Sequence, residues 1–378
     1  MIERFVTRQI RDRLGKGRII VLYGPRRIGK TTVARQLLDE VKPADRLYLN
    51  CDDLTVQKAL ESRSLRVLEQ MIGDAQRIVI DEAQRVTDIG VVLKLLVDNH
   101  PGRDIIATGS SSFELSNKIK EPLTGRSYEF TLEPLSLREL KRHYNYTPLD
   151  MAASYDRLMR LGGYPDIVLE NDNDAATEIT LIAERYVYKD TLEMVELRQR
   201  QLLPRLLQAL ALQVGQEVSY QELSNLLGVK LETVERYITI LEAAFIIYRL
   251  PALSSNKRNQ LSIRKRKIYF YDLGVRNALI KNLNPLELRN DVGGIWENFC
   301  MNERRKANAE QELNPDFYYW RGLYGEVDLV EQQAGQTKAF EFKLTEKLVK
   351  PPKTFTETYP ESSFEVIHRG NLADWLVF

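Results

Sequence analysis

The segment from Gly24 to Thr31 constrains this chain most, because it matches the pattern G-x-x-x-x-G-K-[S/T] at every fixed position. An apolar segment, residues 18–23, precedes it, and residues 32–38 read as the start of a helix. When a strand, a glycine loop and a helix follow in this order, backbone N–H groups and the helix N-terminus surround a phosphate. We therefore predict a nucleotide-binding loop here rather than an ordinary turn with a chance match.

Two side chains of this loop have separate predicted roles. Lys30 is expected to reach the β- and γ-phosphates of ATP, and Thr31 to ligate Mg²⁺. ATP and Mg²⁺ are thus the predicted cofactors. The predicted nucleotide-binding residues of the loop are Gly24, Pro25, Arg26, Arg27, Ile28, Gly29, Lys30, Thr31 and Thr32.

A second apolar strand, residues 77–80, ends in two acidic residues, Asp81 and Glu82. With the loop upstream, this is the pattern of a Walker B strand. Asp81 is expected to hold Mg²⁺ through water, and Glu82 to act as the general base for the attacking water. The alternative is a strand that ends by chance in two acids at a helix start.

A further predicted strand, residues 104–109, leads into Ser110. Polar residues at the carboxyl end of a parallel strand lie near the ligand in open α/β sheets. We expect Ser110 or one of the two serines after it either to sense the γ-phosphate or to cap the next helix.

The composition limits the possible function classes. A chain of 378 residues predicts more than one domain. A net charge of +1 gives no overall field for nucleic acid, so such a site must be a local patch. The two cysteines and three histidines are scattered, which disfavours a metal cluster and a disulfide framework and favours a cytoplasmic protein. No apolar run has the length of a membrane span, and the N-terminus is too charged for a signal peptide.

Residues 216–280 predict a winged helix-turn-helix: two short helices, then two strands that flank a basic loop. This loop predicts contacts with DNA phosphates, whereas acidic residues in the second helix disfavour reading of the bases. The alternative is that the winged helix serves as a lid or an oligomer contact. The predicted nucleic-acid residues are Lys257, Arg258, Arg264, Lys265, Arg266 and Lys267.

Four residues near the C-terminus form a pattern of metal-dependent phosphate chemistry. Glu297 lies in a predicted helix, Asp328 in a strand, and Glu341 and Lys343 on one face of the next strand. The set resembles the PD-(D/E)xK nuclease fold. Asp328 and Glu341 are expected to hold Mg²⁺, which Glu297 completes or orients, while Lys343 positions or deprotonates the attacking water. The alternatives are a solvated hairpin face and a binding module that has lost its catalysis.

The motifs together resemble the AAA-plus-type P-loop ATPases of bacteria and archaea that carry a C-terminal restriction-endonuclease-like domain of unknown function. The resemblance rests on the loop from Gly24 to Thr32, the residues around Asp81 and Glu82, Thr108 to Ser112, and Leu123 to Arg126, and extends to Gly162–Pro165 and Tyr188–Asp190. It implies that Arg126 is a candidate arginine finger for a neighbouring subunit, and hence a homo-oligomer. A surface arginine is the alternative.

We therefore predict an α/β chain with a P-loop NTPase (AAA-plus-like) domain at 1–150 and a helical lid or connector at 151–215. A winged helix at 216–280 and an α/β restriction-endonuclease-like domain at 285–378 follow. The predicted function is ATP hydrolysis that controls a DNA-binding and nuclease-like region. The alternative is a nucleotide-operated switch or scaffold whose C-terminal domain binds DNA or protein without cutting.

Overall fold

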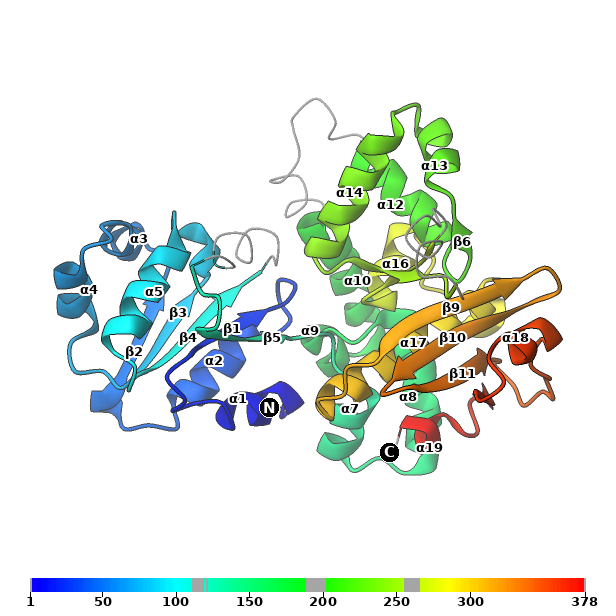
Figure 1. The fold of residues 1–378 in the computed structure, drawn as a ribbon, viewed down its shortest axis with the longest axis horizontal. Helices are drawn as coiled ribbons and strands as arrows, with labels where there is room; N and C mark the ends of the chain where they lie inside the picture. The colour runs from blue at the N-terminus through cyan, green and yellow to red at the C-terminus, as the bar shows by residue number, and fades with distance from the viewer. Residues whose placement is uncertain (1, 111–118, 120–121, 188–201, 255–265, 377–378) are drawn as a thin grey trace. The chain divides into compact units, whose positions relative to one another are not determined.

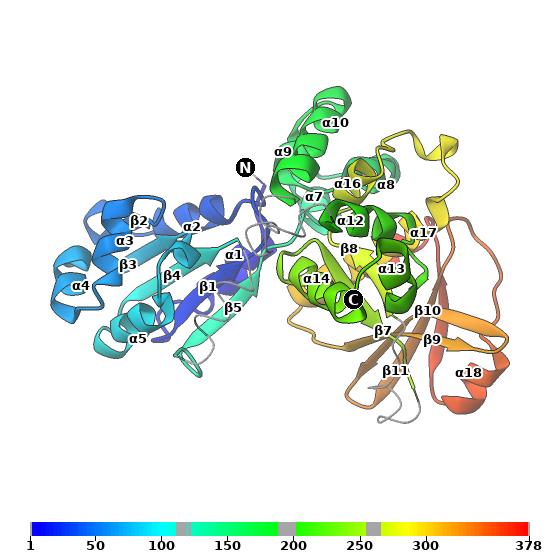
Figure 2. The same cartoon turned by 90° about the horizontal axis from the view of Figure 1, so that it is seen from above.

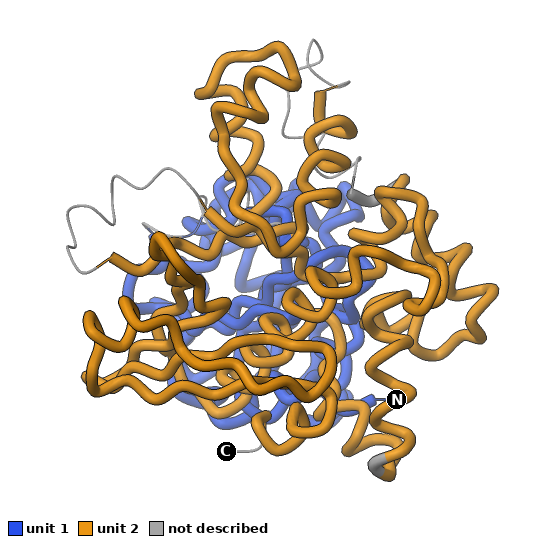
Figure 3. The backbone as a smooth tube through the Cα atoms, turned by 90° about the vertical axis from the view of Figure 1, so that its right-hand side faces the viewer, with its two compact units in different colours: residues 1–133, 243–245 blue, residues 134–242, 246–378 orange. Residues whose placement is uncertain are grey.

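The computed structural model describes residues 2–110, 119, 122–187, 202–254 and 266–376 (Figure 1). The chain divides into two compact units (Figure 3). The first contains Met1–Glu133 and Ala243–Phe245, and the second contains Pro134–Glu242 and Ile246–Phe378. The four-part division expected from the sequence is finer than these two units and stays a prediction.

The N-terminal unit is built on a parallel five-stranded sheet in the order β2-β3-β4-β1-β5. Strands β1 and β3 are buried along their whole length, as continuous apolar strands of parallel sheets are. Because β4 lies between β1 and β3, the segments that follow these three strands emerge side by side at one edge. The strands are β1 (Ile19–Tyr23), β2 (Arg46–Asn50), β3 (Arg77–Asp81), β4 (Asp104–Gly109) and β5 (Ser127–Thr131).

Helices cover both faces of this sheet. The connection from β1 to β2 crosses the sheet in the opposite direction to that from β3 to β4, so right-handed crossovers place α2 and α5 on opposite faces. Figure 2 shows this arrangement. The helices are α1 (Phe5–Arg11), α2 (Lys30–Leu38), α3 (Leu54–Glu61), α4 (Leu65–Ile72) and α5 (Ile89–Asn99), with short 3₁₀ helices η1 (Pro43–Asp45) and η2 (Ala83–Arg85).

The second unit begins with helices and continues into a three-stranded antiparallel sheet in the order β6-β8-β7. The expected helix pair and strand pair of residues 216–280 are confirmed as α13, α14, β7 and β8. The elements are α7 (Leu137–Tyr144), α8 (Pro148–Leu161), α9 (Pro165–Leu169), α10 (Asp172–Leu181), the π-helix η3 (Ile182–Val187), α12 (Leu202–Leu212), β6 (Glu217–Val218), α13 (Tyr220–Leu227), α14 (Leu231–Ala243), β7 (Ile247–Pro251), β8 (Arg266–Phe270) and α16 (Leu273–Leu279).

The C-terminal part of this unit is a four-stranded sheet in the order β12-β11-β10-β9, beside the long helix α17 (Figure 1). Strand β10 is antiparallel to both β9 and β11, whereas β12 is parallel to β11. A register shift between Val327 and Val330 interrupts the pairing of β10 with β9. The elements are η5 (Leu286–Leu288), α17 (Val292–Glu310), β9 (Asp316–Gly322), β10 (Gly325–Gln333), β11 (Gln336–Phe342), α18 (Lys353–Thr358), β12 (Ser363–Ile367) and α19 (Leu372–Leu376).

Buried polar side chains of α17 attach it to the backbone of β8. Asn298 accepts a hydrogen bond from the Phe270 N–H and donates one to the Phe270 carbonyl, both 2.9 Å long. Asn302 donates to the same carbonyl at 2.9 Å. The described part of the chain contains no helix long and apolar enough to span a membrane.

Candidate functional site

The glycine loop has the backbone conformation that a phosphate site requires. Gly24 (φ 151°) and Gly29 (φ 100°) both lie in the region that favours glycine. A Cβ at Gly24 would collide with the carbonyl oxygen of Leu132, so a larger residue is excluded there. Gly29 directly precedes the first turn of α2, where free backbone N–H groups favour an anion.

Lys30 is folded back on its own loop. Its ammonium donates to the carbonyl oxygens of Gly24 at 2.9 Å and of Pro25 at 2.8 Å, and the residue is only 5% exposed. Both acceptors are neutral backbone carbonyls of the loop. The lysine is thus held at the mouth of the loop by bonds that phosphate oxygens can replace.

The loop is also held from the N-terminus by Arg4, which the sequence reasoning missed. Its guanidinium donates to the Ile28 carbonyl at 3.1 Å and to the Glu133 carbonyl at 2.5 Å. The residue is buried. Nothing in the local sequence marks Arg4, because its partners lie 24 and 129 residues away.

Asp81, at the end of β3, collects three hydroxyl groups. Thr31 donates to its Oδ2 at 2.8 Å and Tyr48 donates to the same oxygen at 2.5 Å. Thr108, from β4, donates to Oδ1. Burial, followed by the hydrogen bond to Asp81, raises the pKa of Tyr48 to about 12, so its hydroxyl stays a donor. The carboxylate lies beside the Thr31 hydroxyl, as a Mg²⁺ site at a phosphate loop needs.

Glu82 follows in a left-handed conformation, with φ 54°. Such backbone strain in a non-glycine residue is concentrated at functional sites. Its N–H donates to the hydroxyl of Thr108 at 3.1 Å, and its carboxylate accepts from the Gln84 side chain at 2.5 Å. Gln84 also donates to Ser110 at 3.1 Å, so one amide links the expected base to the expected sensor.

Arg126 lies away from the phosphate loop of its own chain. It directly precedes β5, and its carbonyl accepts from the N–H of Ile19, the first residue of β1. The loop follows the other end of β1, roughly 16 Å further along a five-residue strand. The Arg126 side chain is partly exposed and donates to Asp98 at 2.7 Å.

The second candidate site, in the C-terminal unit, gathers the predicted acidic residues around a lysine. Lys267 of β8 donates to Glu297 Oε1 at 2.7 Å and to Asp328 Oδ1 at 3.3 Å. Tyr269, two residues further along the strand, donates to the same Glu297 oxygen at 2.6 Å. Burial and the neighbouring Asp328 raise the pKa of Glu297 to about 7.

Glu341 and Lys343 pair with each other beside this cluster. Lys343 Nζ lies 2.6 Å from Glu341 Oε1, and the Phe342 N–H between them donates to Asp328 Oδ2 at 2.9 Å. Burial, with Asp328 adding to it, raises the pKa of Glu341. The expected juxtaposition of Asp328, Glu341 and Lys343 is therefore present in space.

Two expectations for this region need correction. Lys267 was expected on an exposed basic wing, but it is 1% exposed and points at carboxylates, so it cannot contact a DNA phosphate. Glu297 was expected to complete or orient a Mg²⁺ site formed by Asp328 and Glu341. Among the residues that the structure describes, no three acidic, histidine or cysteine side chains are arranged to hold a metal ion. The donor set does not fit Mg²⁺, because an ammonium lies between two of the carboxylates.

Most of the expected basic wing lies outside the described residues. This applies to Lys257, Arg258, Arg264 and Lys265. Arg266 is described as the first residue of β8 and is half-buried. The two serines after Ser110 and the segment 188–190 also lie outside the described residues.

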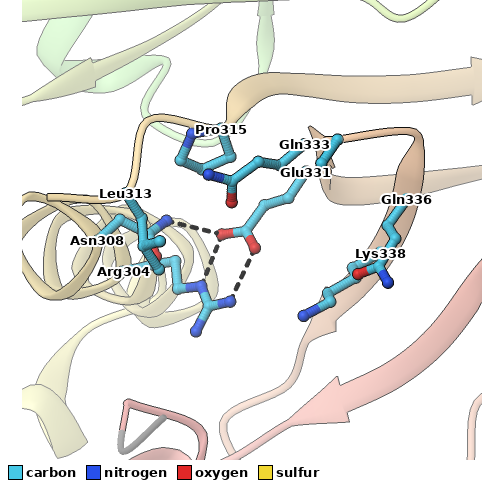
Figure 4. A pocket seen from close by; sticks show the side chains of 9 residues that line it. Arg304, Asn308, Leu313, Pro315, Glu331, Gln333, Gln336 and Lys338 are labelled. Atoms are coloured by element: carbon cyan, nitrogen blue, oxygen red, sulfur yellow. Dashed lines mark hydrogen bonds and ion pairs between the residues drawn. The ribbon is translucent and has the colours of Figure 1, made fainter. Parts of the chain in front are cut away.

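A hollow of about 220 Å³ lies between α17 and the hairpin of β10 and β11 (Figure 4). At its wall, Arg304 forms a two-pronged pair with Glu331, with N–O distances of 2.6 and 2.8 Å. Asn308 donates to the same carboxylate at 3.2 Å. Both oxygens of Glu331 thus have partners within the wall, and the pair stabilises the packing of α17 on β10.

Comparison with known proteins agrees with the geometry of the N-terminal unit. Residues 16–141 match the family model described as "AAA domain". These residues form an AAA-type P-loop domain. Residues 152–286 and 292–372 match the models of two domains of unknown function, DUF8612 and DUF4143.

Several relatives match most of the chain. An uncharacterized protein of Mycobacterium tuberculosis is 29% identical over 353 residues, which cover 90% of this chain and 74% of that protein. An uncharacterized protein of Methanocaldococcus jannaschii is 27% identical, covering 86% of this chain and 75% of that protein. The crystal structure of Cdc6p from Pyrobaculum aerophilum aligns at 14% identity over 75% of this chain and 94% of that chain. Its TM-score of 0.29 is too low to carry an argument.

Proposed function

We propose that this protein hydrolyses ATP at the loop of its N-terminal unit. The observation that carries the proposal is the convergence of Thr31, Tyr48 and Thr108 on the Asp81 carboxylate, directly beside Glu82. A bound nucleotide with Mg²⁺ supplies the phosphoanhydride bond. In this proposal Thr31 and Asp81 hold the metal ion, and Lys30 leaves the loop carbonyls for the phosphate oxygens.

Glu82 takes the proton from the attacking water in this proposal. Gln84 orients its carboxylate and links it to Ser110, so that a change at the γ-phosphate reaches both side chains together. Water activation by a carboxylate favours hydrolysis over transfer of the phosphoryl group to a bound acceptor. A kinase would instead leave a stoichiometric phosphorylated product.

The test is Glu82→Gln in the full chain. We expect ATP binding to persist while turnover falls by roughly 10²- to 10⁴-fold, the range of a general base. Binding is measured with a fluorescent ATP analogue and turnover by phosphate release. Unchanged turnover in this variant would contradict the assignment of Glu82.

Arg126 is proposed as an arginine finger for a second copy of the chain. Its position at the far edge of the sheet supports this, since it cannot reach the loop of its own chain. Arg126→Ala should lower turnover by about 10³-fold or more, as loss of such a finger does. Arg63→Ala is the matched control, because Arg63 also forms an exposed pair with an aspartate of the same unit, Asp88, at 2.8 Å. Equal turnover in the two variants would contradict the proposal.

For the second unit we propose a winged helix at residues 216–280 that binds DNA, followed by a nuclease-like fold at 285–378. The order helix, three antiparallel strands, helix and parallel strand, from α17 to β12, supports the second assignment. ATP binding and hydrolysis then act as a switch for DNA binding. The alternative is that this second unit binds a protein instead of DNA.

The DNA proposal is tested by the salt dependence of binding. Alanine at Lys257, Arg258, Arg264 and Lys265 should flatten the slope of log K against log salt by about 0.9 for each lost phosphate contact. The control removes two exposed lysines of the other unit, Lys58 and Lys94. Fluorescence anisotropy with a labelled duplex measures both. If the two variants give the same slope, the basic wing does not bind DNA.

A further inference from the structure

The cluster of Glu297 and Asp328 contains a positive charge of its own. The ammonium of Lys267 lies 2.7 Å from Glu297 Oε1 and 3.3 Å from Asp328 Oδ1. It is one of the largest fully buried side chains in the described chain. A cation between two carboxylates from separate elements occupies the place that a metal ion takes in a two-carboxylate site.

Four of the six carboxylate oxygens of Glu297, Asp328 and Glu341 are already engaged. Divalent cations of this class bind oxygen lone pairs at about 2.0–2.6 Å. Asp328 uses Oδ1 for Lys267 and Oδ2 for the Phe342 N–H. Glu297 Oε1 accepts from both Lys267 and Tyr269. Glu341 uses one oxygen for Lys343, and its buried Oε2 has no hydrogen-bond partner among the described residues. This leaves two of the six carboxylate oxygens, Glu297 Oε2 and Glu341 Oε2, for a divalent ion that takes about six oxygen ligands.

Lys267 is fixed from both sides. It lies on β8, the central strand of the three-stranded sheet, where it is paired with Glu217 on β6 and with Leu250 on β7. Its side chain therefore cannot leave the cluster by the movement of a single loop. Burial alone lowers the pKa of Lys267, but Glu297 and Asp328 outweigh burial and raise it, so the ammonium keeps its proton.

We infer that Lys267 is the resident cation of this carboxylate cluster, in place of a divalent metal ion. The ammonium neutralises charge and ties β8, α17 and β10 together, and it offers no activated water. If the nuclease-like fold proposed above is correct, the C-terminal unit therefore binds its partner without cutting nucleic acid. The inference about cutting rests on that proposed fold, whereas the inference about the metal ion rests on the lysine alone.

The first test uses the wild-type chain without nucleotide. Millimolar Mn²⁺ should leave its unfolding temperature unchanged, and a DNA duplex with Mg²⁺ should stay intact. A stabilisation by Mn²⁺ that disappears in Asp328→Asn would overturn the inference. Metal-dependent cleavage that disappears in the same variant would overturn it as well. Both readouts are independent of ATP turnover, so their failure leaves the ATPase proposal untouched.

The second test removes the lysine charge while keeping the length of the side chain. Lys267→Met leaves two buried carboxylates close to each other without their cation. We expect this variant to bind Mn²⁺ at least about tenfold more tightly than wild type, because the repulsion from the ammonium is gone and Asp328 Oδ1 is released. Calorimetry or Mn²⁺ electron paramagnetic resonance measures the affinity. Binding as weak as in wild type, in a folded variant, would contradict the inference.

The matched control is Arg304→Met. Arg304 is also a buried cation of the same unit, but it faces the single carboxylate of Glu331. It should lose stability without gaining Mn²⁺ affinity. If both variants gained the same affinity, general loosening of the unit would explain the effect and the specific role of Lys267 would be rejected. If Lys267→Met does not fold, the wild-type measurements above still decide the question.

Discussion

Asp81 and Asp328 are buried to the same extent, each 4% exposed, yet they have opposite kinds of partner. Asp81 accepts hydrogen bonds from three hydroxyl groups, whereas Asp328 faces the ammonium of Lys267 and one backbone N–H. Hydroxyl groups solvate a carboxylate but leave its charge in place. An ammonium cancels that charge.

Lys30 and Lys267, the lysines of the two sites, also differ in their partners. Lys30 donates to the neutral carbonyls of Gly24 and Pro25, and phosphate oxygens can replace these hydrogen bonds. Lys267 is attached to two carboxylates, so an incoming ligand would have to break a buried ion pair. An acid and a lysine in one site are thus weak evidence for phosphate chemistry when they are already paired with each other, as Asp328 and Lys267 are.

The largest expected effect is the loss of ATP turnover when Asp81 is replaced. Asp81→Asn keeps the shape of the side chain and removes the charge that Mg²⁺ requires. ATP turnover should fall by about 10²-fold or more, since a metal ion contributes several kcal/mol to the transition state. Phosphate release at saturating ATP measures it, with the exposed Asp74→Asn as control. Turnover close to that of wild type would contradict the proposal that Asp81 holds Mg²⁺ for ATP hydrolysis.

The next largest effect is a loss of folding stability when the cation beside Asp328 is removed. Lys267→Met leaves two uncompensated buried carboxylates and should lower the free energy of unfolding by about 3–5 kcal/mol. The double variant Lys267→Met/Glu297→Gln should recover part of this loss, because one of the two charges is gone. All three tryptophans, Trp296, Trp320 and Trp375, belong to this unit, so urea unfolding followed by tryptophan fluorescence reports it directly. If Lys267→Met were as stable as wild type, the ion pairs of Lys267 with Glu297 and Asp328 would not be formed.

A smaller effect distinguishes the hydroxyl groups around Asp81. Thr108→Val removes a fully buried hydroxyl that serves both Asp81 and the N–H of Glu82, and should cost about 1–3 kcal/mol. Tyr48→Phe removes a hydroxyl from a half-buried residue and should cost less, about 1 kcal/mol. Circular dichroism in urea measures both. The reverse order would show that Thr108 is not the central support of the site.

The smallest effect concerns Asp291, a carboxylate that two arginines neutralise near the surface. Partial burial raises its pKa, but the hydrogen bonds from Arg289 and Arg276 outweigh burial and bring the pKa to about 2. A lowered pKa contributes stability above the unfolded value, and this stability is lost as the pH falls from about 4 to about 2. Asp291→Asn should show a weaker loss over this range, measured by urea unfolding at each pH. Identical pH profiles would contradict the assignment.

The parts of the first site that the sequence predicts are those that lie within one motif. The glycine loop, Lys30 and Thr31 are adjacent in the chain, and Asp81 and Glu82 end a recognisable strand. Tyr48 and Thr108 lie on other strands, 33 and 27 residues from Asp81. Strand order alone brings them to Asp81, and a single sequence does not contain that order. Gln84 was visible next to Glu82, but only the position of Ser110 shows what it connects.

Lys267 demonstrates the limit of reading charge along the chain. In sequence it closes a run of cations, which predicts an exposed patch. It is also the first residue of the apolar segment 267–271, where Lys267 and Tyr269 share one face of a strand. That alternation was the available signal for burial. The carboxylate partner, Glu297, lies 30 residues away on a helix, so the ion pair could not be predicted from the run itself.

The stoichiometry of Mn²⁺ binding to the full chain tests most directly the proposed difference between the Asp81 site and the Asp328 site. The account predicts one Mn²⁺ per chain, bound only with a non-hydrolysable ATP analogue and lost in Asp81→Asn. A second Mn²⁺ that binds without nucleotide and is lost in Asp328→Asn would contradict it, because Lys267 would then not be the cation of that site.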